Sequence, residues 1–122
     1  MPIEKIGRVS RPGSPNIHLG ASSPDMISVC LTAPDRSGDV EDQTRQVLGV
    51  IARHLRDAGS SRRRVLMVQV WLADIGDFDD FRAAWNAWIE PDHVPALSVV
   101  EARASRPDSL VEIRAYAAPG DA

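Results

Sequence analysis

The chain has 122 residues, 43% of them hydrophobic and 25% charged, a length and composition typical of one globular domain spanning residues 1–122. Its net charge of -3 gives no basis for a nucleic-acid or anionic-membrane partner. The one cysteine, Cys30, excludes an intramolecular disulfide and fits the reducing cytoplasm.

Sequence motifs for cofactors and membranes are missing. No glycine-rich nucleotide loop and no HExxH zinc motif occurs, and the three histidines lack metal-ligand spacing. No stretch approaches the roughly 20 apolar residues of a membrane helix, and the segment MPIEKIGRVS does not resemble a signal peptide. We therefore expect a cytoplasmic protein without a metal or an organic cofactor.

Three short strands are predicted before the first helix, at residues 2–9, 16–20 and 26–33. The segment Arg11-Pro12-Gly13-Ser14-Pro15 separates the first two as a loop, because prolines cannot pair in a strand interior. Residues 21–25 form the next predicted turn. The third strand, MISVCLTA, is rich in apolar and β-branched residues.

The first helix is predicted to begin after Asp39, a suitable N-cap, and to end at Gly59 in the C′ position. Between them, apolar residues recur with helical spacing and form one stripe. Its members are Val40, Val47, Ile51, Leu55 and Ala58.

Residues 65–73, VLMVQVWLA, are predicted to form a strand buried on both faces. Alternation places Leu66, Val68, Val70 and Leu72 on one face, and Met67, Gln69 and Trp71 on the other. Asp77 is the predicted cap of a second helix, which Pro91 stops. Its aromatic residues, Phe78, Phe81, Trp85 and Trp88, share one face.

Residues 95–103 and 110–117 are the last predicted strands, and the Pro107-Asp108 turn between them suggests an antiparallel hairpin. Residues 119–122 form a predicted tail. The order β-β-β-α-β-α-β-β predicts an α+β two-layer sandwich with both helices on one sheet face. Met67 and Trp71 would leave the other face apolar, which favours its burial against another subunit.

Several local sequences, in this order and spacing, resemble those of the Rid (YjgF-like) family over nearly the whole chain. They are Gln43-Thr44, Val47-Leu48, Ala58-Gly59-Ser60, Val70-Trp71-Leu72-Ala73-Asp74, Asp77-Phe78, Pro95-Ala96 and Leu110-Val111-Glu112-Ile113. The stretch from Ala84 to Trp88, followed by His93, is most similar to the YoaB-like branch.

The resemblance implies a chorismate-mutase-like fold and a homotrimer with a central barrel-like core and a ligand cleft between neighbouring subunits. It also implies hydrolysis of reactive imines or enamines to keto acids and ammonia without a cofactor. In such proteins an arginine after Pro-Ala clamps the substrate carboxylate, and a glutamate in the last strand handles water or a proton.

This chain departs from that pattern at three positions. Leu97 stands where the arginine is expected and offers no charge for a carboxylate. Cys30-Leu31 replaces a Ser-Gly pair whose backbone amides would help to hold the ligand, and Val99 replaces a cysteine. Glu112 keeps the glutamate position and is the candidate catalytic residue.

The remaining candidate ligand contacts are Leu97, Ser98, Cys30, Leu31, Trp88 and His93. Four of the candidate site residues have a simpler explanation: Trp88 as a core residue, Cys30 as a buried thiol, His93 as a loop residue and Glu112 as a solvated or arginine-paired side chain. Arg103 and Arg114 are candidate replacements for the missing clamp, although Arg103 lies about 20 Å along the strand from Leu97.

Three functions remain open at this stage. The first is a cofactor-free, deaminase-like hydrolase for a small imine or enamine that differs from 2-iminopropanoate. The second is a non-catalytic trimeric protein that binds or senses a metabolite. The third is a pathway enzyme in which the same scaffold serves another reaction.

Overall fold

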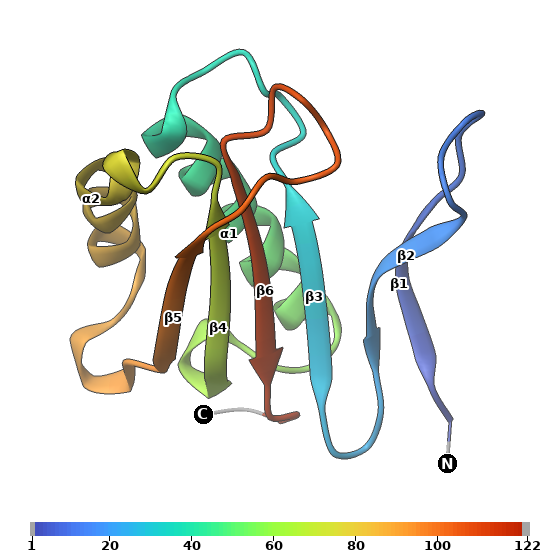
Figure 1. The fold of residues 1–122 in the computed structure, drawn as a ribbon. Coiled ribbons are helices and arrows are strands. Elements are labelled where there is room, and N and C mark those ends of the chain that lie inside the picture. The colour runs from blue at the N-terminus through green and yellow to red at the C-terminus, as the bar shows by residue number, and fades with distance from the viewer. Residues whose placement is uncertain (1, 121–122) are drawn as a thin grey trace.

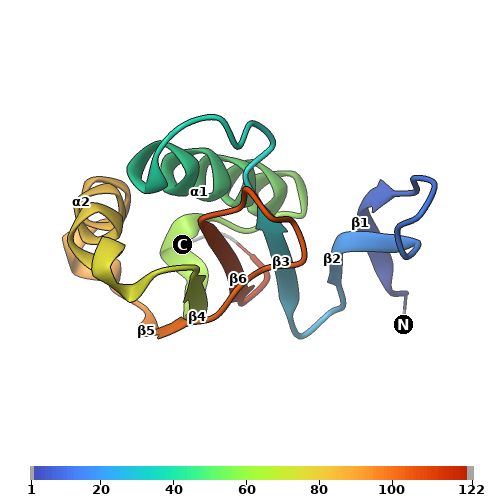
Figure 2. The ribbon, with the colours of Figure 1, turned by 45° about the horizontal axis from the view of Figure 1, so that its top comes forward.

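The computed structural model describes residues 2–120 and contains one sheet with two α-helices on one face (Figures 1 and 2). The strands are β1 (Glu4–Val9), β2 (Ile17–Ser22), β3 (Ile27–Thr32), β4 (Val65–Leu72), β5 (Ala96–Glu101) and β6 (Val111–Ala117). The helices are α1 (Val40–Asp57) and α2 (Phe78–Trp88), with 3-10 turns η1 (Arg62–Arg64), η2 (Ile75–Asp77) and η3 (Pro91–His93). The predicted α+β class and element order are confirmed.

The strand order in the sheet is β1-β2-β3-β6-β4-β5, so the predicted hairpin of the last two strands is wrong. β5 pairs in parallel with β4 alone, whereas β6 lies antiparallel between β3 and β4. Burial explains why β6, and not β5, occupies the central position in the sheet. Alternate residues of β6 are fully buried, which requires a central position, whereas β5 is mostly exposed and suits an edge.

The core lies between the sheet and the helices. Val29, Val70 and Ile113, from three neighbouring strands, are fully buried, as are Val47 and Ile51 of α1. Successive side chains in a strand point to opposite faces. The intervening residues of β3, β4 and β6 therefore lie on the face without helices, which is called the open face below.

Helix α1 has the predicted boundaries. The Oδ1 atom of Asp39 accepts a hydrogen bond from the Asp42 N–H at 2.9 Å, which satisfies a donor of the first turn. The helix ends at Asp57, and Gly59 adopts a φ of 83°, the left-handed conformation that glycine supplies at C′.

Helix α2 begins after Asp77, as predicted, but its capping and its end differ from the prediction. Asp77 precedes the helix, but its side chain makes no capping hydrogen bond; Asp74 instead accepts from the Gly76 N–H in the preceding 3-10 turn. The helix ends at Trp88, because Ile89 is already extended with ψ 143°, and Pro91 opens the next turn instead of stopping the helix.

Two strand details also need correction. A bulge between Val65 and Met67 removes Leu66 from the buried face, so that Val65 is buried and Leu66 is exposed. Strand β2 continues to Ser22, through residues predicted as a turn, because Gly20, Ala21 and Ser22 pair with β3.

The C-terminal end of the described chain lies against the turn that follows α1. The Gly120 N–H donates to the Gly59 carbonyl at 2.9 Å, so the first part of the predicted tail is hydrogen-bonded, while residues 121–122 lie outside the described residues. Within residues 2–120, no helix has the length and apolar character needed to cross a membrane.

Candidate functional site

The open face of the sheet carries Glu112 and several other candidate side chains. Alternation places Cys30 of β3, Glu112 and Arg114 of β6, and Met67 and Trp71 of β4 on this face. Register brings them together across strands, since Cys30 pairs with Arg114 and Trp71 pairs with Glu112. Residues separated by more than 80 positions thus become neighbours.

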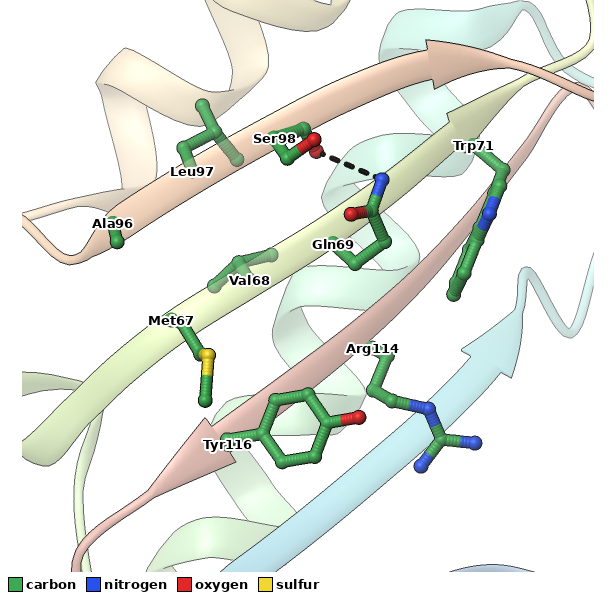
Figure 3. Close-up of a pocket in the computed structure, with 9 residues that line it drawn as sticks. All are labelled: Met67, Val68, Gln69, Trp71, Ala96, Leu97, Ser98, Arg114 and Tyr116. Carbon is green, nitrogen blue, oxygen red and sulfur yellow. Dashed lines mark hydrogen bonds between the residues drawn. The ribbon is translucent and has the colours of Figure 1, made fainter.

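A cavity of about 430 Å³ opens on this face over β4, β5 and β6 (Figure 3). Its walls are mainly apolar, with the polar groups of Gln69, Ser98 and Arg114 among them. The lining residues are Met67, Val68, Gln69, Trp71, Ala96, Leu97, Ser98, Arg114 and Tyr116. A concave apolar surface with a few polar groups is the usual character of a small-molecule site.

Gln69 is held in place in this cavity. Its Nε2 atom donates to the Ser98 carbonyl at 3.3 Å, across the β4–β5 pair (Figure 3), and to the Val70 carbonyl at 3.1 Å. These bonds occupy the amide N–H groups and fix the side chain, so its carbonyl oxygen is the part of Gln69 that remains to accept from a ligand.

Arg114 is the positive charge of the cavity wall. Its Nη1 atom donates to the Ser28 hydroxyl at 2.9 Å, and its guanidinium carbon lies 5.9 Å from the centre of the Tyr116 ring. That distance suits a cation–π contact. A guanidinium has five N–H donors, so the bond to Ser28 leaves donors for an anion.

Glu112 lies beside Cys30 on the same face. The Cys30 Sγ–H donates to Glu112 Oε2 at 3.3 Å. Burial first, and then this hydrogen bond, raise the pKa of the Cys30 thiol to about 12. Cys30 is therefore a protonated hydrogen-bond donor at neutral pH and not a thiolate nucleophile, and it orients one oxygen of the carboxylate.

A second, more polar cavity of about 290 Å³ lies on the other side of Arg114, between the β1–β2 hairpin and β3. Arg114 lines both cavities. The second is lined by Lys5, His18, Leu19, Gly20, Ala21, Ser28 and Arg114. Within residues 2–120, no group of three or more metal-ligating side chains could hold a metal ion.

The candidate residues from the sequence fall into two groups. Leu97 and Ser98 line the first cavity, and Cys30 joins Glu112 beside Arg114. Leu97 is paired with Val68, a buried core residue, so strand alternation directs its side chain to the helix side of the edge strand.

Three candidates lie away from both cavities. Leu31 is buried in the core on the helix side of the sheet. Trp88 of α2 packs against the core, with its ring 5.7 Å from that of Trp85, and His93 lies half-buried in η3. Their predicted ligand contacts stay predictions.

Other lining residues were not among the sequence candidates. Gln69, Tyr116, Lys5 and His18 reach the two cavities through strand pairing. The alternation of residues 110–117 already groups Arg114 and Tyr116 with Glu112. This shared strand face was the sequence signal that could have identified Tyr116 as a residue of the site. The β1–β2 hairpin, which brings in Lys5 and His18, had no comparable signal.

Known proteins resemble this chain in sequence. The family model described as Endoribonuclease L-PSP matches residues 31–119. A RutC family protein of Haemophilus ducreyi is 37% identical over 79 residues, covering 65% of this chain and 68% of the relative. The RutC family protein YoaB of Escherichia coli K12 is 35% identical over 80 residues, covering 66% and 70%.

Solved structures agree with the sequence comparison. The crystal structure of a YjgF-family protein from Neisseria meningitidis has a TM-score of 0.84 and 31% identity, covering 100% of this chain and 98% of that one. A YjgF/YER057c/UK114-family protein from Mycobacterium tuberculosis, at 21% identity and a TM-score of 0.79, shares the fold over 96% of this chain and 99% of its own. Because the family model spans most of the chain and these relatives agree with it, the chain belongs to the YjgF/RutC family of the Endoribonuclease L-PSP model.

Proposed function

We propose that this protein is a cofactor-free, deaminase-like hydrolase of the cytoplasm that acts on a small imine or enamine with an apolar body. One observation carries the proposal: Glu112, with one oxygen held by Cys30 at 3.3 Å, lies on the open face next to Trp71 of the apolar cavity. A positioned carboxylate beside an apolar binding surface suits proton transfer to and from a bound molecule.

The proposed reaction needs only water and one acid–base group. Glu112 accepts a proton from water as the water oxygen attacks the carbon of the C=N bond, and the nitrogen takes up a proton. The resulting carbinolamine then loses ammonia and leaves a carbonyl compound. The balance is imine plus water giving carbonyl plus ammonia, and an enamine first isomerises to the imine by taking a proton at carbon and losing one from nitrogen.

The proposed assembly is a homotrimer in which neighbouring subunits cover the open face and turn the cavity into an intersubunit cleft. Exposed apolar side chains on that face support this arrangement, among them Met67 of β4 and Val100 of β5. Apolar groups gathered on one face favour burial against another subunit.

The proposed substrate is larger and less polar than 2-iminopropanoate. Leu97 provides no charge at the position where the family resemblance implies a carboxylate clamp. A methyl group would fill little of a cavity of about 430 Å³, whereas an aromatic or branched body would bury more apolar surface there.

The test generates the imine of phenylalanine continuously with an amino-acid oxidase and measures its hydrolysis with and without the protein. We expect wild-type protein to speed hydrolysis, Glu112→Gln to lose about 100-fold or more of this effect, and Glu4→Gln to keep it. Glu4 is a matched control because it is an exposed strand glutamate outside both cavities. Equal rates for wild type and Glu112→Gln would contradict the role of Glu112.

A non-catalytic metabolite-binding trimer is the second candidate. Leu97 favours this function, because its uncharged side chain can contact an apolar ligand but cannot hold the carboxylate of a reacting imine. This function predicts a rise in melting temperature with ligand and no acceleration of imine hydrolysis by the wild-type protein.

A further inference from the structure

Three basic side chains meet in the second cavity, which we call the basic recess: Lys5 of β1, His18 of β2 and Arg114 of β6. Strand pairing brings them together, because β2 pairs with both β1 and β3, and β3 pairs with β6. The hairpin that carries Lys5 and His18 extends beyond the helices (Figures 1 and 2). Among residues 2–120, no carboxylate lines the recess.

The charges of Lys5 and Arg114 in the recess are not neutralised by ion pairs. Among the described residues, neither Lys5 nor Arg114 forms an ion pair with a carboxylate. The Arg114 guanidinium is instead oriented by the Ser28 hydroxyl at 2.9 Å. A neutral partner fixes the direction of the guanidinium without cancelling its charge, which leaves it able to bind an anion.

Arg114 also joins the recess to the apolar cavity, since it lines both. An anionic group bound at Arg114 and Lys5 would therefore place the rest of its molecule toward Tyr116, Met67 and Trp71. By formal charge at pH 7, with His counted as neutral, Lys5, Arg114 and Glu112 together leave one net positive charge on this part of the face, which matches a monoanion. The arrangement fits an apolar body that ends in a single carboxylate.

We propose that the basic recess binds the carboxylate of an aromatic or branched monocarboxylic ligand whose body occupies the apolar cavity. The cation that the family resemblance places at Leu97 is thus supplied from the opposite side, by Arg114 and Lys5. Taking this ligand to be the substrate rests on the proposed function, but binding by the recess does not depend on turnover.

The test compares binding of 3-phenylpropanoate with that of its neutral isostere, 3-phenylpropanamide, by titration calorimetry on the 122-residue chain. We expect wild-type protein to prefer the carboxylate by about tenfold or more. Lys5→Gln should reduce the preference to roughly threefold or less, and Arg8→Gln, a change at another basic residue of β1 that lines neither cavity, should leave it intact.

Arg114→Gln should remove the preference, and Lys5→Gln provides the test if this change at the half-buried Arg114 prevents folding. Equal affinity of wild type for the two probes, or a preference that Lys5→Gln leaves unchanged, would overturn the proposal. Inorganic phosphate that binds as tightly as 3-phenylpropanoate would also overturn it, since the apolar body would then contribute nothing.

The two proposals fail separately in this design. A carboxylate preference that depends on Lys5, without acceleration of imine hydrolysis, supports the recess and contradicts the hydrolase. Imine hydrolysis that depends on Glu112, without any carboxylate preference, supports the hydrolase and contradicts the recess.

Discussion

The Sγ atom of Cys30 lies 3.3 Å from Oε2 of Glu112, and this hydrogen bond joins two residues 82 positions apart. It connects β3 to β6 on the open face, where Cys30 pairs with Arg114 in register. The thiol thereby lies between a carboxylate and a guanidinium. Its protonation state and the orientation of Glu112 are consequently linked.

The Cys30 thiol should resist alkylation in the folded protein. Its pKa is raised to about 12, so the thiolate fraction at pH 8 is about a thousandfold below that of an ordinary thiol. We expect iodoacetamide to label the native chain at least about 100-fold more slowly than the urea-unfolded chain, as measured by mass spectrometry. Similar rates in both states would contradict the buried, protonated thiol.

The same thiol predicts an alkaline loss of stability. A pKa raised in the folded state means that folding favours the protonated thiol. Its contribution is complete below the ordinary thiol pKa of about 9 and is lost as the pH rises toward 12. Urea unfolding between pH 8 and 11 should show a steeper decline for wild type than for Cys30→Ala, and parallel declines would contradict the prediction.

Gly20 should not accept a side chain. A Cβ atom at this position would lie 2.3 Å from the Ser28 carbonyl oxygen, so Gly20→Ala must push β2 away from β3. We expect a loss of about 2 kcal/mol or more in the free energy of unfolding. Gly49→Ala is the matched control, because no atom lies within 4 Å of its Cβ position on the exposed side of α1; it should gain about 0.5–1 kcal/mol.

Gln43 should be a sensitive position for folding. Its buried side chain donates to the Gly38 carbonyl at 3.1 Å and accepts from the Leu110 N–H at 3.0 Å, which connects two loops to α1. Gln43→Leu would leave these groups without partners and cost about 2–4 kcal/mol in urea unfolding. Gln46→Leu, on a more exposed part of the helix, should cost less than about 1 kcal/mol, because water can replace its bonds.

Met67 should be required for the proposed trimer. Met67→Lys would place a charge in the apolar interface and should shift the protein to monomers in light scattering. Ile75→Lys is the control, because Ile75 is also 45% exposed but lies in η2, outside the sheet. Trimers that survive Met67→Lys, or that Ile75→Lys also disrupts, would contradict an interface on the open face.

The sequence by itself determined the element order, the limits of α1 and the two-layer class, because capping residues and apolar periodicity are local signals. Asp39, Gly59 and the alternation of residues 111–117 each act within a few positions. The resemblance likewise marked Leu97 and Glu112 from short stretches of sequence. A local pattern, however, does not specify which strands become neighbours.

Only the tertiary structure decided the position of β6 between β3 and β4, which the predicted hairpin had missed. That choice depends on burying alternate residues of β6 between two neighbouring strands and the helices, a property of the whole sheet and not of the turn before it. The same pairing brings Cys30 to Glu112 and connects Arg114, through β3 and β2, to Lys5. The candidate site is therefore a consequence of long-range strand register, which residue spacing along the chain does not encode.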